Sequence, residues 1–239
     1  MNVSLQSATN ARTAQPSTQP SSRVAAIAVF VREWRGEWRT RAALNASVLF
    51  AIAAPIALSF NVATQNLSAE ALAGCLWSVL LFAALVGLPR AFVREEESGT
   101  AAQLRLSCPP EAVLWGKAAF NLALLALTQI AAVPLFIVLL NARVTQPLSL
   151  IAILLAGDIG LAVVCTLLGA IASQARARGA LFAAVAVPVL LPLLGAASVA
   201  TSATFGANSS FWPGLQIVLT YDVLVLAASW MLFDAVWLA

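Results

Sequence analysis

Histidine is absent from this 239-residue chain, which also holds only three cysteines. Without an imidazole, the chain cannot supply a histidine general base or a histidine metal ligand. Cys75, Cys108 and Cys165 are far apart and form no Cys-x-x-Cys pair, so the sequence indicates neither a zinc site nor a disulfide framework. We expect the cysteines to be small apolar side chains in the core, and we expect no metal site.

Nucleotide-binding and catalytic motifs are also missing. A phosphate-binding loop needs a glycine, four residues, and then Gly-Lys followed by Ser or Thr. The only Gly-Lys pair here is Gly116 and Lys117, which Ala118 follows, and Glu111 stands where the first glycine belongs. No nucleophile, base and orienting group come together in the sequence either. We therefore expect no catalytic residues, no ATP hydrolysis and no cofactor bound by this chain alone.

Charged residues are scarce, at 10% of the chain, while 61% of residues are hydrophobic; a soluble domain is about 25% charged. A helix rises about 1.5 Å per residue and needs about 20 apolar residues to cross a bilayer core. The segments that meet this length are 42–60, 70–88, 113–140, 148–172, 180–200 and 214–238. The sequence thus predicts an all-α polytopic membrane protein with six transmembrane helices, folded as one domain over residues 23–239.

The basic residues lie on alternate sides of these spans. Twelve of the thirteen Lys and Arg residues precede the first span, lie near the junction of the second and third, or follow the fourth, and only Arg143 lies on the other side. Segments that keep Lys and Arg remain cytoplasmic, so we expect both termini inside. The net charge of +3 reflects this orientation toward anionic lipid. It does not indicate a nucleic-acid partner.

The N-terminal segment divides into two parts. Residues 1–22 are rich in Ser, Thr, Gln and Asn and lack apolar periodicity, so we expect a disordered cytoplasmic tail. In residues 23–41, an apolar stripe recurs at helical spacing while Arg and Glu occupy the other faces; the stripe is Ile27, Val31, Trp34 and Trp38. This pattern predicts an interfacial amphipathic helix whose Trp rings lie at headgroup depth and whose Arg side chains reach lipid phosphates. The alternative is a positively charged flank without a helix of its own.

The segment 89–112, between the second and third spans, carries most of the polar residues. Three acidic residues, Glu95, Glu96 and Glu97, follow Arg94, and Gly99 then interrupts the helix. A second, short helix is expected from Thr100 to Leu106, with Thr100 and Gln103 placed as a capping pair. A charge run is more often only a solvated face. The combination of charges, a glycine break and a short helix nevertheless favours a docking site for another protein.

Few polar residues lie inside the spans, where an unpartnered ionisable group costs at least a few kcal/mol. Lys117, Asn121 and Thr128 share one face of the third span, which we expect to face the bundle, with Lys117 reaching back to the cytoplasmic headgroups. Asp158 lies about ten residues into the fourth span between two glycines, so it is either protonated, in a wet cavity, or at a kink. Asn121 and Asp158 are therefore the candidate cavity residues. Asp222, nearer the outer end of the last span, is expected to reach water.

Two prolines, Pro188 and Pro192, lie four residues apart in the fifth span. Each removes a backbone donor, so a kinked or interrupted helix is expected there. Such a place is a candidate hinge, although proline also occurs in membrane helices without a mechanistic role.

The chain resembles the membrane subunits of ABC-2-type exporters, and in particular the haem exporter B subunit of cytochrome c maturation, the CcmB family. The resemblance is carried by FVREEESGTAAQLRLSCPPEAVLWGK at 92–117, by the apolar span that follows, and by RGALFAAVAVPVLLPLLG at 178–195. It covers about residues 25–239. The paired prolines after Arg-Gly distinguish this family from other ABC-2 permeases, whereas the acidic segment is shared with them.

The resemblance implies a permease in the bacterial inner membrane that pairs with a separate ATPase subunit, two copies of each. The other partners would be haem-handling membrane subunits and a periplasmic haem chaperone, with ATP hydrolysed by the partner and haem bound, if at all, by the complex. The residues that would contact the ATPase are Arg90, Arg94, Glu95, Glu96, Glu97, Gly99, Thr100, Leu104 and Arg105. The alternatives are an ABC-2 permease for a lipid, glycan or drug, and a membrane scaffold that transports nothing.

Overall fold

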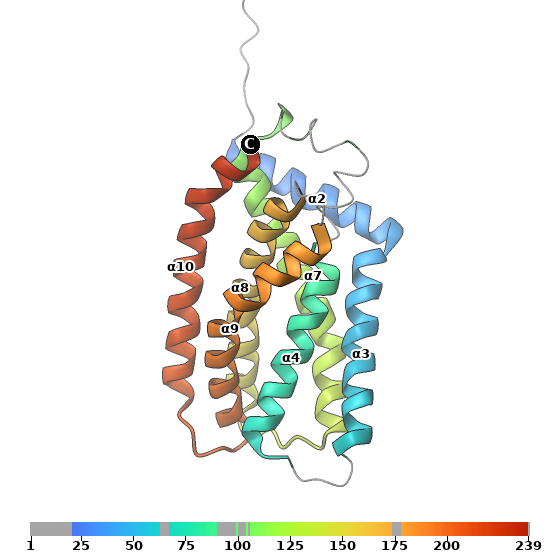
Figure 1. The fold of residues 1–239 in the computed structure, drawn as a ribbon, viewed down its shortest axis with the longest axis vertical. Coiled ribbons are helices and arrows are strands. Elements are labelled where there is room, and N and C mark those ends of the chain that lie inside the picture. Colours follow the sequence, from blue (N-terminus) through green and yellow to red (C-terminus); the bar gives the residue numbers. More distant parts are fainter. Residues whose placement is uncertain are drawn as a thin grey trace, which may run out of the picture.

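The computed structural model describes residues 21–62, 67–89, 99, 104, 106–173 and 178–238. All regular structure in these residues is α-helical. Its elements are α2 (Ser22–Thr40), α3 (Ala42–Val62), α4 (Ala69–Gly87), α7 (Pro110–Leu139), α8 (Pro147–Ser173), α9 (Arg178–Thr204) and α10 (Phe211–Leu238). The six long helices run side by side, and α2 lies across one end of them (Figure 1). We call this the α2 end, and the opposite one the far end.

The six predicted membrane spans are confirmed, since the described part of the chain contains six helices long and apolar enough to cross a bilayer. Their boundaries differ from the predicted ones by a few residues. The third span begins at Pro110 instead of residue 113, because proline is well suited to the first turn of a helix, where its missing N–H has no partner to lose. The fifth continues to Thr204, since Thr204 and Ser202 donate hydrogen bonds to carbonyls one turn back in their own helix.

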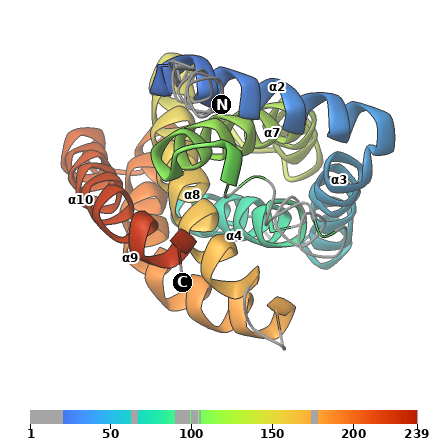
Figure 2. The same cartoon turned by 90° about the horizontal axis from the view of Figure 1, so that it is seen from above.

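Helix α8 is the centre of the bundle. In its most apolar stretch 72% of residues are buried, against 22% in α3 and in α10. It packs on α7, α9 and α10 (Figure 2). At Gly157 the Trp77 ring of α4 lies where a β-carbon would be, and Gly160 makes the same kind of room for Asp222 and Leu193. These two glycines therefore serve close packing, and α8 runs through them without a break.

Helix α9 is continuous through Pro188 and Pro192. Its ribbon changes direction between its first and second halves (Figure 1). The hydroxyl of Tyr221 on α10 donates to the carbonyl oxygen of Val189, between the two prolines, at 2.7 Å. A role as a hinge remains a prediction.

Candidate coupling site at the α2 end

The predicted docking segment is described at only a few positions. Of the proposed contact residues, the structure describes Gly99 and Leu104. The others lie outside the described residues: Arg90, Arg94, Glu95, Glu96, Glu97, Thr100 and Arg105. Residues 1–20 of the predicted tail also lie outside them. Gly99 is an exposed turn residue with φ +68°, a conformation that favours glycine. Leu104 and Leu106 are both helical, and the Cys108 N–H donates to the Leu104 carbonyl oxygen.

The two leucines of this segment point in opposite directions. Leu104 is 4% exposed and Leu106 is 90% exposed. Leu104 belongs to an apolar cluster at the α2 end, which we call the α2-end cluster: Val29, Leu104, Val113, Leu114, Leu167, Ala170, Phe233 and Trp237. Leu104 is therefore covered by the bundle, and Leu106 is the leucine of this segment that is accessible from outside. A contact of either residue with another protein stays a prediction.

The α2-end cluster brings together four helices and the docking segment. Val29 comes from α2, Val113 and Leu114 from the first turn of α7, and Leu167 and Ala170 from the last turns of α8. Phe233 and Trp237 come from the end of α10, with their rings stacked at 5.7 Å between centroids. Leu104 is thus part of one close-packed cluster with side chains of α2, α7, α8 and α10.

Helix α2 has three faces where the sequence indicated two. Two members of the apolar stripe are turned away from the bundle, Ile27 at 63% and Trp38 at 56% exposure, whereas Val31 is half-buried and Trp34 packs partly against the core. The arginines are exposed as well. The face that packs on the bundle is the third one, made by every fourth residue: Ala25, Val29, Glu33 and Glu37. The sequence placed both glutamates off the apolar stripe, and the structure buries them at 1% and 7% exposure.

Lys117 is the partner that allows Glu33 to be buried. Its Nζ atom donates to Glu33 Oε1 at 3.0 Å, and both side chains are 1% exposed. The prediction that Lys117 reaches back to the headgroups was therefore wrong. A buried carboxylate and a buried ammonium each demand a counter-charge, and the two helices supply one another's. The periodicity of a single helix could not predict this pair, since its members are 84 residues apart in the sequence.

The predicted inward face of α7 is confirmed, because Lys117, Asn121 and Thr128 are all buried. Asn121 donates through Nδ2 to Thr166 Oγ1 of α8 at 2.8 Å. Two turns further along the same seam, Gln129 donates through Nε2 to Asp158 Oδ1 at 2.7 Å. Asp158 is thus held by an amide from the neighbouring helix, and the glycines beside it do not open a kink.

Two further polar contacts inside the bundle were missed by sequence reasoning. The indole N–H of Trp77 donates to Thr201 Oγ1 at 2.8 Å, which ties α4 to α9. Asp222 is 4% exposed, so the expectation that it reaches water was wrong; neither of its carboxylate oxygens has a hydrogen-bond partner among the described residues. The close contact with Gly160 explains its burial, because that glycine leaves room for the carboxylate against α8.

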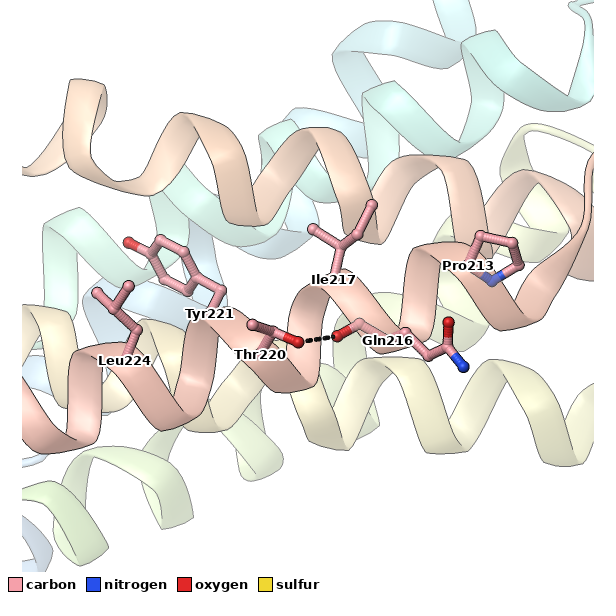
Figure 3. Close-up of a pocket in the computed structure, with 6 residues that line it drawn as sticks. All are labelled: Pro213, Gln216, Ile217, Thr220, Tyr221 and Leu224. Carbon is pink, nitrogen blue, oxygen red and sulfur yellow. Dashed lines mark hydrogen bonds between the residues drawn. The ribbon is translucent and has the colours of Figure 1, made fainter.

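Three surface hollows formed by described residues do not contain the predicted cavity residues. One, of about 430 Å³, is formed by α10 alone and lined by Pro213, Gln216, Ile217, Thr220, Tyr221 and Leu224; Figure 3 shows the Thr220 hydroxyl bonded to the Gln216 carbonyl oxygen along that helix. Two others, of about 480 and 520 Å³, lie between α3 and α4 and at the far end between α8 and α10. Neither Asp158 nor Asn121 lines any of the three. Among the described residues, no three His, Cys, Asp or Glu side chains are grouped as metal ligands would be.

Comparison with known proteins identifies the family of this chain. A protein-family model described as CcmB protein matches residues 24–235, which is most of the chain. Neither a curated protein nor a solved structure matches it. The match spans α2 and almost all of the six long helices, and it leaves out the N-terminal tail. The chain therefore belongs to the CcmB family of haem exporter proteins, and it is a multi-pass membrane component of an exporter of the ABC type.

Proposed function

We propose that this chain is the permease subunit of an inner-membrane complex for cytochrome c biogenesis, with both termini and the α2 end in the cytoplasm. A separate ATPase subunit contacts the segment 89–112, and the complex contains two copies of the ATPase and two of this chain. ATP hydrolysis in that partner drives either haem export or release of the haem-loaded periplasmic chaperone. Other haem-handling membrane subunits complete the assembly.

The observation that carries the proposal is the division of labour between Leu104 and Leu106. Exposed Leu106 offers an apolar contact to a partner, while Leu104 is packed among side chains of α2, α7, α8 and α10. A push received on the outer side of this short helix is therefore delivered to four helices at once. A loop that served only to keep the protein soluble would have no need to insert a leucine into the core.

The absence of histidine supports a subunit that transmits force and leaves axial ligation of haem iron to its partners. Within the described parts of the six spans, Asp158 and Asp222 are the only buried carboxylates. This small number supports the use of an external energy source, since an ion-coupled carrier would use several at graded depth. Both points concern what the chain contributes to the complex, which is movement rather than chemistry.

The proposal is tested by capture from native membranes with a tag on this chain. We expect a nucleotide-hydrolysing subunit and haem-delivery proteins to be recovered, with ATP hydrolysis stimulated over that of the isolated ATPase. Recovery without any ATPase would indicate a scaffold. Recovery of an ATPase without haem-delivery proteins, and with normal cytochrome c in a strain lacking this chain, would indicate another cargo.

The acidic run provides the matching variant test. Exchange of Glu95, Glu96 and Glu97 for Ala is expected to lower the amount of ATPase captured, because the charges would no longer face the partner. Glu70 is the control: it is also an exposed acidic residue, but it lies at the far end, in the first turn of α4. If the triple variant captures as much ATPase as the parent chain, the proposed docking role of this acidic run is contradicted.

A further inference from the structure

We propose that Glu33 and Lys117 are positioning residues that make α2 and α7 move as one unit, so that a displacement of the docking segment also reaches α3. The inference rests on the proposed coupling to an ATPase. It assigns α2 a mechanical part in the cycle, in addition to its place at the membrane surface.

The buried ion pair is the first support for this role. The two side chains meet at 3.0 Å, each 1% exposed, with Lys117 in the second turn of α7, just after the docking segment ends. If α2 lifted away from α7, it would leave a charge without its counter-charge in a poorly hydrated place. Arg32 also contacts the same carboxylate, at 3.3 Å, but from the solvent side, with 44% of its side chain exposed. The carboxylate of Glu33 is thus aimed into the bundle and closed off from outside by Arg32.

The close approach of the two backbones is the second support. A β-carbon on Gly116 would lie 2.7 Å from the Ala26 carbonyl oxygen and 2.7 Å from the Val29 β-carbon. No side chain of α7 separates the helices at this crossing. Helices in such direct contact cannot slide past one another without first separating, and separation breaks the ion pair one residue away.

The third support is the joint between α2 and α3. Glu37, one turn after Glu33 on the same face, accepts a hydrogen bond from the Leu44 backbone N–H in the first turn of α3 at 2.9 Å. This N–H is one of those that a helix start leaves without an intrahelical partner, and a carboxylate there is favoured by the helix dipole. Arg41, with φ 52°, forms the tight turn between the two helices. Helix α2 is therefore fastened at Glu33 to α7 and at Glu37 to α3.

Charge-neutral and charge-reversed pairs separate this role from a role in folding alone. The double variant E33Q/K117M removes both buried charges, and Arg32, which also contacts Glu33, has 44% of its side chain in solvent. The variant is therefore expected to accumulate and to capture the ATPase like the parent chain. We expect its cytochrome c output per captured complex to fall by about threefold or more, within the range by which residues of a coupling network usually act. The swapped variant E33K/K117E should recover most of that output. R32Q, which removes only the exposed partner of Glu33, should leave it unchanged.

The inference is overturned if E33Q/K117M makes cytochrome c at the parental level per captured complex. It is also overturned if the neutral and the swapped pairs both fail to accumulate in the membrane, because the pair would then be a folding element. Capture of the ATPase by the parent chain is measured in the same experiment. If the parent captures none, the proposed function fails; if it captures the ATPase and the neutral pair behaves as the parent does, only the present inference fails.

Discussion

Three pairs of buried polar side chains join neighbouring helices of the bundle. Gln129 with Asp158, Asn121 with Thr166, and Trp77 with Thr201 each join two spans through a bond of 2.7 to 2.8 Å. Such bonds hold membrane helices together with energies of about 0.6 to 2 kcal/mol each. Small residues at the same level let the helices approach, so polar and steric complementarity act together.

The two leucines of the docking segment should respond differently to truncation. Leu104→Ala removes a buried side chain and is expected to lower the free energy of unfolding by about 2 to 5 kcal/mol. Leu106→Ala removes a side chain that is 90% exposed, so stability should be unchanged while the amount of captured ATPase falls. Thermal unfolding of the purified chain and capture from membranes measure the two effects. Equal effects of both variants on both measurements would contradict the assignment.

The glycine beneath Trp77 should not tolerate a methyl group. A β-carbon at Gly157 would lie 2.1 Å from the Trp77 ring, and Gly157→Ala is therefore expected to cost about 1 to 3 kcal/mol of stability. Gly195→Ala is the control, because nothing lies within 4 Å of that β-carbon in α9. A thermal midpoint unchanged in both variants would show that the ring moves aside without cost.

At the scale of the element, α2 illustrates how a short helix serves three surroundings. One face packs on the bundle through Val29 and Glu33, another exposes Ile27 and Trp38, and a third exposes arginines. Phe30, Trp34 and Trp38 stack in sequence, and the Arg41 guanidinium lies 5.4 Å from the centre of the Trp38 ring. Aromatic and basic side chains arranged in this way are typical of helices at the headgroup layer.

The exposed arginines of α2 should hold anionic phospholipid. In R35Q/R39Q the number of phosphatidylglycerol molecules retained per chain is expected to fall, because each Arg near the surface contributes about 1 kcal/mol of attraction to anionic lipid. Arg143 is the control: it is exposed as well, but it lies in the loop after α7 at the far end. Native mass spectrometry of chains extracted from mixed bilayers makes the measurement. An equal loss in R143Q would show that the effect is not specific to α2.

At the scale of the whole molecule, the spans place the two ends on opposite sides of the bilayer. Helix α2, the start of α7 and the C-terminal turns of α10 meet at one end, and α3, α7 and α9 end at the other (Figure 1). In the sequence, all basic residues but Arg143 precede the first span, lie near the junction of the second and third, or follow the fourth. The positive-inside rule therefore predicts that the segment 89–112 lies on the cytoplasmic side, where ATP is available.

Single-cysteine labelling tests this orientation. In a chain whose native cysteines are replaced, Asn208→Cys, in the exposed loop after α9, should react with a membrane-impermeant maleimide added to spheroplasts. Thr40→Cys, exposed at the end of α2, should react only after the membrane is broken. The opposite pattern would place the docking segment out of reach of any cytoplasmic ATPase, and the proposed coupling would fall with it.

The number of spans, the interfacial helix and the family likeness were predictable from the sequence by itself, because each depends on local quantities. Runs of apolar residues of sufficient length must become helices in a bilayer, where backbone groups have no water to bond. The inward face of α7 followed from helical periodicity in the same way. Even the boundaries were close, and they shifted where Pro110 or hydroxyl side chains extended a helix.

Only the tertiary structure decided which residue meets which. Periodicity gives the angle at which a side chain leaves its helix, but the neighbour that covers this angle comes from a distant part of the chain. In the sequence Glu33 was only a charge off the apolar stripe of its helix, and the structure pairs it with Lys117. Leu104 was only an apolar residue of a charged segment, and the structure buries it in one cluster with residues of α2, α7, α8 and α10. A glutamate is stable at the surface or buried beside a lysine, and a leucine is found both exposed and buried. Their roles therefore depend on the neighbours that the fold provides rather than on residue type.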